Sequence, residues 1–93
     1  MIFEYNRKKN QTNIEKHGVD FEEAATVFYD PLVKIKADWS QKEERLIAIG
    51  HSSRGNFLFV VYCERGNEAD QEIIRIISAR KVTRAERRSM EGL

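Results

Sequence analysis

The sequence predicts a small α+β fold in which helices pack on an antiparallel sheet, in the order β-α-α-β-β-β-α. A chain of 93 residues has room for one hydrophobic core. Two helical segments with clear start and stop signals lie in the first third, and the second half alternates β-branched apolar runs with short polar turns. We therefore expect a single domain over residues 1–93.

The chain begins with a predicted strand over residues 1–5, which carries large apolar side chains. A helix over 7–17 should follow, because Asn6 is a favoured N-cap and Gly18 is a favoured residue just after a last turn. Its interior is almost entirely polar, and Ile14 is its one large aliphatic residue. Such a helix either contacts the core lightly or uses its polar groups for a purpose.

A second helix is predicted from Asp20, which resembles the first residue of a capping box closed by Glu23. Its apolar residues recur at helical spacing and form one stripe, made of Phe21, Ala24, Ala25 and Phe28. Asp30-Pro31 should end this helix, because the residue before a proline avoids the helical conformation.

Four further strands are predicted over 32–36, 45–50, 57–64 and 72–78. The turn at 52–56 contains Gly55 for a positive φ angle, and 65–71 is expected to be a loop. The nearly continuous apolar start of 57–64 predicts a central strand covered on both faces. Thr83 and Glu86 fit a capping box that opens a short cationic last helix.

The net charge of +1 conceals an uneven distribution of charge. The last nineteen residues carry six basic side chains, Arg75, Arg80, Lys81, Arg84, Arg87 and Arg88, whereas the middle third is acidic. Such a pattern favours a polyanion bound on one face, although solvated helix faces would explain it equally simply.

Cys63 is the only cysteine, so no internal disulfide can form, and this fits a reducing compartment. The polar residues after Phe3 do not resemble a signal peptide, and no apolar run approaches membrane-spanning length. These observations predict a cytoplasmic protein without contact to a membrane. Phosphate-loop and zinc-ligand motifs are absent, and the acidic pairs Glu22-Glu23 and Glu43-Glu44 are interpreted as solvated, so we expect neither metal nor cofactor.

Four segments in this order and spacing resemble the BrnT toxins. They are Lys9-x-x-x-Asn13-x-x-Lys16-His17-Gly18-Val19-x-Phe21-Glu22-Glu23-Ala24; Asp30-Pro31-Leu32; Glu44-Arg45 with Ile49-Gly50-x-Ser52 and Tyr62-Cys63-Glu64-Arg65-Gly66; and Arg75-Ile76-Ile77-Ser78-Ala79-Arg80 with Thr83-Arg84-x-Glu86-Arg87. The resemblance covers nearly the whole chain. It implies a RelE-like fold and an endoribonuclease that acts as the toxin of a type II toxin-antitoxin system, inhibiting translation and growth.

The resemblance also implies a partner, a BrnA-like antitoxin with a ribbon-helix-helix domain. Toxin and antitoxin would form a hetero-oligomer that represses its own operon, and the toxin would contact operator DNA only through the antitoxin. RNA would be the toxin's substrate.

Cleavage of RNA without a metal requires removal of the 2′-OH proton, stabilisation of the phosphorane and protonation of the leaving 5′-oxygen, and it yields a 2′,3′-cyclic phosphate. Arginine suits the second task because its planar fork binds two phosphate oxygens. Arg65 and Arg80 each follow a predicted strand. Our first hypothesis is that both hold the scissile phosphate; the alternative is a surface pair with a carboxylate such as Glu64 or Glu86.

His17 is the candidate for proton transfer, because a histidine side chain has an ordinary pKa of about 6.5. Its alternative role is that of a helix-end cation, and Glu64 is an alternative base. Further basic or amide side chains are candidates for RNA binding, namely Lys9, Asn13, Lys16, Arg45, Arg84, Arg87 and Arg88. Asn13 could instead bond a loop carbonyl, Tyr62 could be a core residue rather than a base-stacking one, and Trp39 could contact the antitoxin.

Two other functions remain open at this point. A non-catalytic nucleic-acid-binding module would bind RNA in a salt-dependent way without cutting it. A co-repressor acting only with its antitoxin would do neither.

Overall fold

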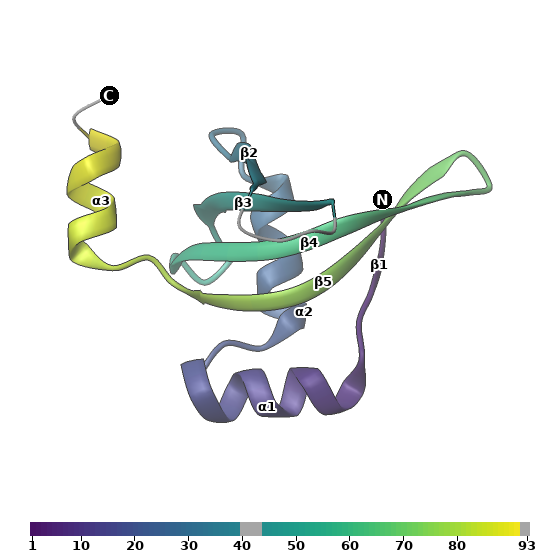
Figure 1. Ribbon diagram of the computed structural model, residues 1–93, viewed down its shortest axis with the longest axis horizontal. Coiled ribbons are helices and arrows are strands. Elements are labelled where there is room, and N and C mark those ends of the chain that lie inside the picture. The colour runs from purple at the N-terminus through teal and green to yellow at the C-terminus, as the bar shows by residue number, and fades with distance from the viewer. Residues whose placement is uncertain (40–43, 92–93) are drawn as a thin grey trace.

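The computed structural model describes residues 1–39 and 44–91, which form a five-stranded sheet, three α-helices and one 3-10 helix (Figure 1). In chain order the elements are β1 (Ile2–Glu4), α1 (Arg7–His17), α2 (Phe21–Ala25), η1 (Thr26–Tyr29), β2 (Lys34–Asp38), β3 (Arg45–His51), β4 (Phe57–Glu68), β5 (Gln71–Lys81) and α3 (Arg84–Glu91). The α+β class is as predicted. The expected order was one strand short, because each of the four β segments after the second helix forms its own strand.

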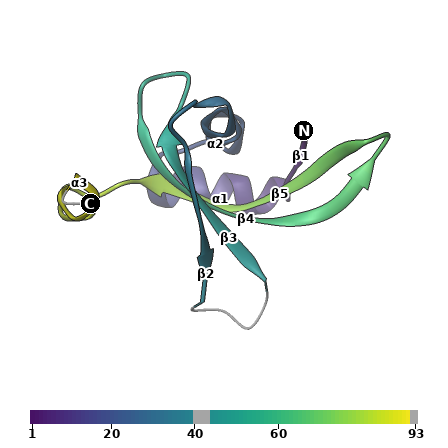
Figure 2. The same ribbon diagram turned by 90° about the horizontal axis from the view of Figure 1, so that it is seen from above.

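The sheet has the strand order β1-β5-β4-β3-β2. Strands β2 to β5 form the expected antiparallel meander. β1 departs from it, because it pairs in parallel with β5, with Ile2 opposite Ile73 and Glu4 opposite Arg75. β1 and β2 are therefore the edge strands, and α3 lies beyond one end of the sheet (Figures 1 and 2).

One face of the sheet packs on α1, α2 and η1 and forms the hydrophobic core. Its most deeply buried side chains come from both layers and include Val19, Phe21, Val27, Leu58, Val60 and Ile76. Tyr62 belongs to this core, where it is 4% exposed and meets the ring of Phe28 edge-on at 4.8 Å. The alternative of a core tyrosine therefore holds, and Tyr62 is not available to stack on a base.

The helix α1 has the predicted ends. The Asn6 side chain accepts a hydrogen bond from the Lys9 amide at 3.0 Å, and Gly18 adopts the left-handed conformation with a φ of 70°. The polar interior of the helix is explained by Asn13, which is 5% exposed. Its amide donates to the carbonyls of Val19 at 2.9 Å and Ala79 at 2.8 Å and accepts from the Ala79 N–H at 3.1 Å. A buried amide thus fastens α1 to β5 in place of an apolar stripe.

The predicted second helix divides into α2 and the 3-10 helix η1. Asp20 caps it by accepting from the Glu22 amide at 2.9 Å. Glu23 does not close the expected capping box, because its carboxylate accepts from the Ser52 hydroxyl at 2.6 Å and from the Asn56 side-chain amide at 2.7 Å. The interpretation of Glu22-Glu23 as a solvated pair is wrong for Glu23, which is 7% exposed. Glu43 of the other acidic pair lies outside the described residues.

The prediction that β4 is covered on both faces is wrong. Leu58, Val60 and Tyr62 face the core, but the alternate residues of β4 are only half-buried on the opposite face. We call that opposite side the open face. The strand register assigns to it Lys34, Lys36, Ile47, Ile49, His51, Phe57, Phe59, Val61, Ser78 and Arg80.

The predicted loop over 65–71 is instead part of a β-hairpin. β4 and β5 continue to a two-residue turn at Ala69 and Asp70, whose φ angles of 50° and 64° are both positive. This hairpin extends away from the body of the molecule (Figure 1). In the described part of the chain, no helix is both long and apolar enough to cross a membrane.

Candidate functional site

The open face carries a cationic cluster centred on the ring of Phe59. The guanidinium carbon of Arg80, on the neighbouring strand β5, lies 4.2 Å from the ring centroid. The Lys36 ammonium reaches the same ring from β2, at 5.8 Å. The sheet places β5 on one side of β4 and β2 on the other, beyond β3. The two cations therefore come from opposite sides of the strand that carries Phe59, and the ring attracts both.

The guanidinium fork of Arg80 is occupied by the carboxylate of Glu86 on α3. The two N–H···O contacts are parallel, at 2.7 and 2.9 Å. Glu86 also closes the predicted capping box, because it accepts from the Thr83 amide at 2.9 Å and its own amide donates to the Thr83 hydroxyl at 3.1 Å. The pair with Arg80, helped by the Thr83 amide, lowers the pKa of Glu86 to about 2.

The same contact raises the pKa of Arg80, so both partners are charged across the physiological range. A planar arginine fork that binds two oxygens of a carboxylate can also bind two oxygens of a phosphate. Arg80 is therefore arranged to bind an oxyanion and is paired with an internal one. The alternative stated for Arg80, a pair with Glu86, is what the structure contains.

The hypothesis that Arg65 and Arg80 meet at one phosphate is contradicted by the strand register. Arg80 lies opposite Phe59, which is six residues before Arg65 on β4, or about 20 Å along an extended strand. In an antiparallel pair the two C-terminal ends point in opposite directions, so residues that end neighbouring strands are far apart. Arg65 lies instead at 3.5 Å from Glu4 on β1, and Glu64 is exposed beside it.

The predicted groups on α1 gather along a groove beside the edge of β5. Lys9, Lys16 and His17 line a cavity of about 300 Å³ together with Ser78, which lies two residues before Arg80 on β5. His17 is therefore placed beside β5 near Ser78, on the side of the sheet where α1 packs, whereas Arg80 belongs to the open face. Asn13 also borders this groove, but all three of its hydrogen bonds go to backbone groups, so the loop-carbonyl alternative holds.

The other predicted RNA-binding arginines lie on the open face or on α3. Arg45 begins β3 and lies opposite Asp38 of β2. Arg84 and Arg88 are exposed on α3. Arg87, on the same helix, places its guanidinium 5.3 Å from the ring centroid of Phe57.

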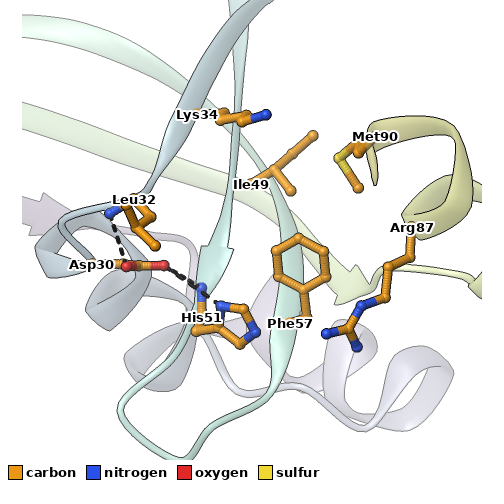
Figure 3. A pocket seen from close by; sticks show the side chains of 8 residues that line it. All are labelled: Asp30, Leu32, Lys34, Ile49, His51, Phe57, Arg87 and Met90. Atoms are coloured by element: carbon orange, nitrogen blue, oxygen red, sulfur yellow. Dashed lines mark hydrogen bonds and ion pairs between the residues drawn. The ribbon is translucent and has the colours of Figure 1, made fainter. Parts of the chain in front are cut away.

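Phe57 and His51 belong to a pocket between α3 and the open face that the sequence did not reveal (Figure 3). The two rings stack at 4.6 Å with an angle of 21° between their planes. Asp30 supports His51, accepting from its backbone N–H at 2.7 Å. The backbone N–H groups of His51 and Leu32 hold the pKa of the Asp30 carboxyl below its ordinary value.

The sequence contains a pattern that could have predicted this pocket, because residues of one kind recur at every second position in two predicted strands. Lys34 and Lys36 are separated by one residue, and so are Phe57 and Phe59. Period-two spacing places each pair on one face of a strand. The continuous apolar character of 57–64 hid that signal, because it favoured two buried faces.

The comparisons with known proteins agree with one another. A family model described as "Ribonuclease toxin, BrnT, of type II toxin-antitoxin system" matches residues 5–86. Among solved structures, the crystal structure of the Brucella abortus ribonuclease toxin BrnT is similar to this fold, with a TM-score of 0.69 and 25% sequence identity over 90% of this chain and 100% of that chain. No curated protein matches the chain.

Proposed function

The chain belongs to the BrnT family of ribonuclease toxins of type II toxin-antitoxin systems, and on that premise we propose that it cleaves RNA without a metal ion, with Arg80 on the scissile phosphate. The observation that carries this proposal is the fork of Arg80. It lies on the Phe59 ring and binds a carboxylate through two parallel hydrogen bonds. A phosphate that displaced Glu86 would meet the same two N–H groups, and Lys36 is the second cation on that ring.

The proton transfers are assigned to the α1 groove. His17 stays our prediction for proton transfer, and Lys9 and Lys16 stay predictions for binding backbone phosphates; all three line the groove that meets β5 at Ser78. Arg45, Arg84, Arg87 and Arg88 would bind further phosphates by charge. Arg65 and Glu64 lie too far along the sheet to act on the phosphate at Arg80, so any role for them is at another part of the RNA.

A toxin of a type II toxin-antitoxin system has an antitoxin as its partner. We propose that this antitoxin is BrnA-like, with a ribbon-helix-helix domain, that the toxin reaches operator DNA only through it, and that the hetero-oligomer forms in the cytoplasm. We further propose that residues 1–93 act as one toxin domain. Trp39, which is 91% exposed, stays our prediction for an antitoxin contact.

The test is a cleavage assay on antitoxin-free protein, with total RNA and EDTA present. We expect Arg80→Ala to reduce cleavage by about 10²–10³-fold, because it removes the donors that stabilise the phosphorane. Arg54→Ala is the matched control: Arg54 is also an arginine in contact with a glutamate, Glu23 at 3.8 Å, but it lies in the β3–β4 turn. Circular dichroism would check that each variant is folded.

Four outcomes separate the possible functions. Cleavage that persists in Arg80→Ala would exclude Arg80 from the site, and cleavage abolished by EDTA would exclude a metal-free mechanism. If wild-type protein cuts RNA only when translating ribosomes are added, the activity is ribosome-dependent. RNA binding without cleavage under both conditions would favour the non-catalytic module.

A further inference from the structure

The pocket between α3 and the open face combines an apolar wall with a cationic rim. Its volume is about 240 Å³. Ile49, Phe57 and Met90 supply apolar surface, and Lys34 and Arg87 bring positive charge from β2 and from α3 (Figure 3). Such a combination suits a ligand that has both a flat apolar part and a negative part.

Two flat groups face each other at the wall of this pocket. The His51 imidazole lies nearly parallel to the Phe57 ring, and Arg87 approaches that ring at 5.3 Å. His51 is held in place by its neighbours, because Asp30 accepts its backbone N–H at 2.7 Å and lies 3.7 Å from its Nδ1 atom. The surface offered to a ligand is thus fixed before the ligand binds, which lowers the entropic cost of stacking.

The pocket lies next to the Arg80 site along β4. Phe57 and Phe59 are two residues apart on the same face of β4, so their rings lie about 7 Å apart along the strand. The guanidinium group of Arg87 contacts the Phe57 ring, and that of Arg80 contacts the Phe59 ring. Arg87 also follows Glu86 in α3, so the same helix contributes to both places.

We infer that this pocket is a nucleotide subsite, in which the base adjoining the phosphate at Arg80 extends the stack that His51 and Phe57 form. The inference rests on the ribonuclease function proposed above and adds to it the position of a base. Proteins that bind single-stranded nucleic acid combine aromatic surfaces for the bases with cations along the backbone. The Phe57 and Phe59 rings on β4, with the guanidinium groups of Arg87 and Arg80 beside them, form such an arrangement. The positive charge of Lys34 at the pocket favours a ligand that carries phosphate over an apolar protein segment.

The experiment measures binding separately from cleavage. The probe is a 2′-O-methyl RNA hexamer, which lacks the 2′-OH needed for cleavage, and the comparison is an abasic oligonucleotide of the same length and charge. We expect antitoxin-free wild-type protein to bind the hexamer about 10-fold more tightly than the abasic chain, because only the hexamer has bases that can stack.

Two variants test whether the pocket causes that preference. Leu32→Asp adds a carboxylate at the pocket rim, where the leucine is 81% exposed and its loss cannot unfold the core. His51→Ala removes the stacking ring. We expect both to reduce the preference to about twofold or less. The matched control is Trp39→Asp, which makes the same change of an exposed apolar residue at the other end of β2.

Each result decides between the alternatives. Equal affinity of wild-type protein for the two oligonucleotides would overturn the subsite, and so would a preference that both pocket variants retain. Loss of antitoxin binding in Leu32→Asp, with base-dependent binding unchanged, would show that the pocket binds protein and would also overturn it. Failure of wild-type protein to cleave ordinary RNA, with and without ribosomes, would count against the proposed function alone.

Discussion

Amide side chains, rather than apolar ones, fasten the first helix of this molecule to the second helix and to the sheet. Asn10 accepts from the Phe21 amide at 2.9 Å, and Asn13 reaches the backbone of Ala79 and Val19. The sequence could show that α1 is too polar for a core helix, but it could not show which backbone groups its amides meet. Those partners are up to 66 positions away in the chain and are defined only by the complete fold.

Substitution of Asn13 by aspartate should destabilise the protein by about 2–4 kcal/mol. A carboxylate can accept from the Ala79 N–H, but it cannot donate to the two carbonyls and places a charge among buried groups. Urea unfolding would measure the loss. Asn6→Asp makes the same chemical change at the N-cap, where aspartate is equally suitable, and should stay within about 0.5 kcal/mol of wild type. If Asn13→Asp were as stable as wild type but bound RNA more weakly, Asn13 would instead belong to the RNA interface.

The pair of Arg80 and Glu86 should make stability depend on pH in an acidic window. The folded pKa of Glu86 is about 2, below its ordinary value of 4.5, so the carboxylate stabilises the folded state fully above pH 4.5 and loses that effect as the pH falls through 2. The difference in unfolding free energy between wild type and Glu86→Gln should therefore be constant from neutral pH to about 5 and then shrink. A difference that does not change with pH would mean that the pair is not formed in solution.

At the scale of elements, the sequence located helix ends better than strand partners. Asn6, Gly18, Thr83 and Glu86 act as predicted, because a cap involves residues only three or four positions apart. Strand partners depend on distant segments, and the parallel pairing of β1 with β5 had no local signal. The expected meeting of Arg65 with Arg80 failed for the same reason, since two strand ends can be compared only when the direction of each strand is known.

Two substitutions in the turn between β4 and β5 should raise the stability of the protein. Ala69 and Asp70 both adopt positive φ angles, which favour asparagine and glycine in a two-residue hairpin turn. The double substitution Ala69→Asn and Asp70→Gly should stabilise the protein by about 1 kcal/mol, or roughly 4–8 °C in Tm. Differential scanning calorimetry would measure the shift. Ala69→Val, which adds a β-branched side chain at the same angle, should lower Tm, and a rise would show that the turn differs in solution.

At the scale of the whole molecule, the proposed attraction to RNA would come from the placement of charge rather than from its sum. The net charge is only +1, yet Lys34, Lys36, Arg80 and Arg87 meet around two rings at one end of the open face. The uneven charge of the sequence predicted such a concentration. That concentration was expected in the last nineteen residues, whereas β2 contributes lysines from a segment not considered for RNA binding.

Affinity for the 2′-O-methyl hexamer should fall steeply as salt rises. For a single strand, each phosphate contact contributes about 0.7 to the slope of log affinity against log salt concentration. Lys36→Gln should reduce the magnitude of that slope by about 0.7, because it removes one cation from the Phe59 ring. Arg54→Gln should leave the slope unchanged, and an equal effect of both variants would mean that the RNA does not follow the open face.

The parallel pairing of β1 with β5 has a consequence for how the protein is made. Ile2 emerges from the ribosome early, but its partner Ile73 is translated 71 positions later, and Arg80 later still. The sheet can close only after most of the chain has been synthesised, because its edge strand waits for the strand beside it. A nascent toxin therefore lacks both its finished sheet and Arg80, the residue proposed to bind phosphate, until translation has passed β5, so the proposed activity could not begin on the messenger from which the chain is being read before that point.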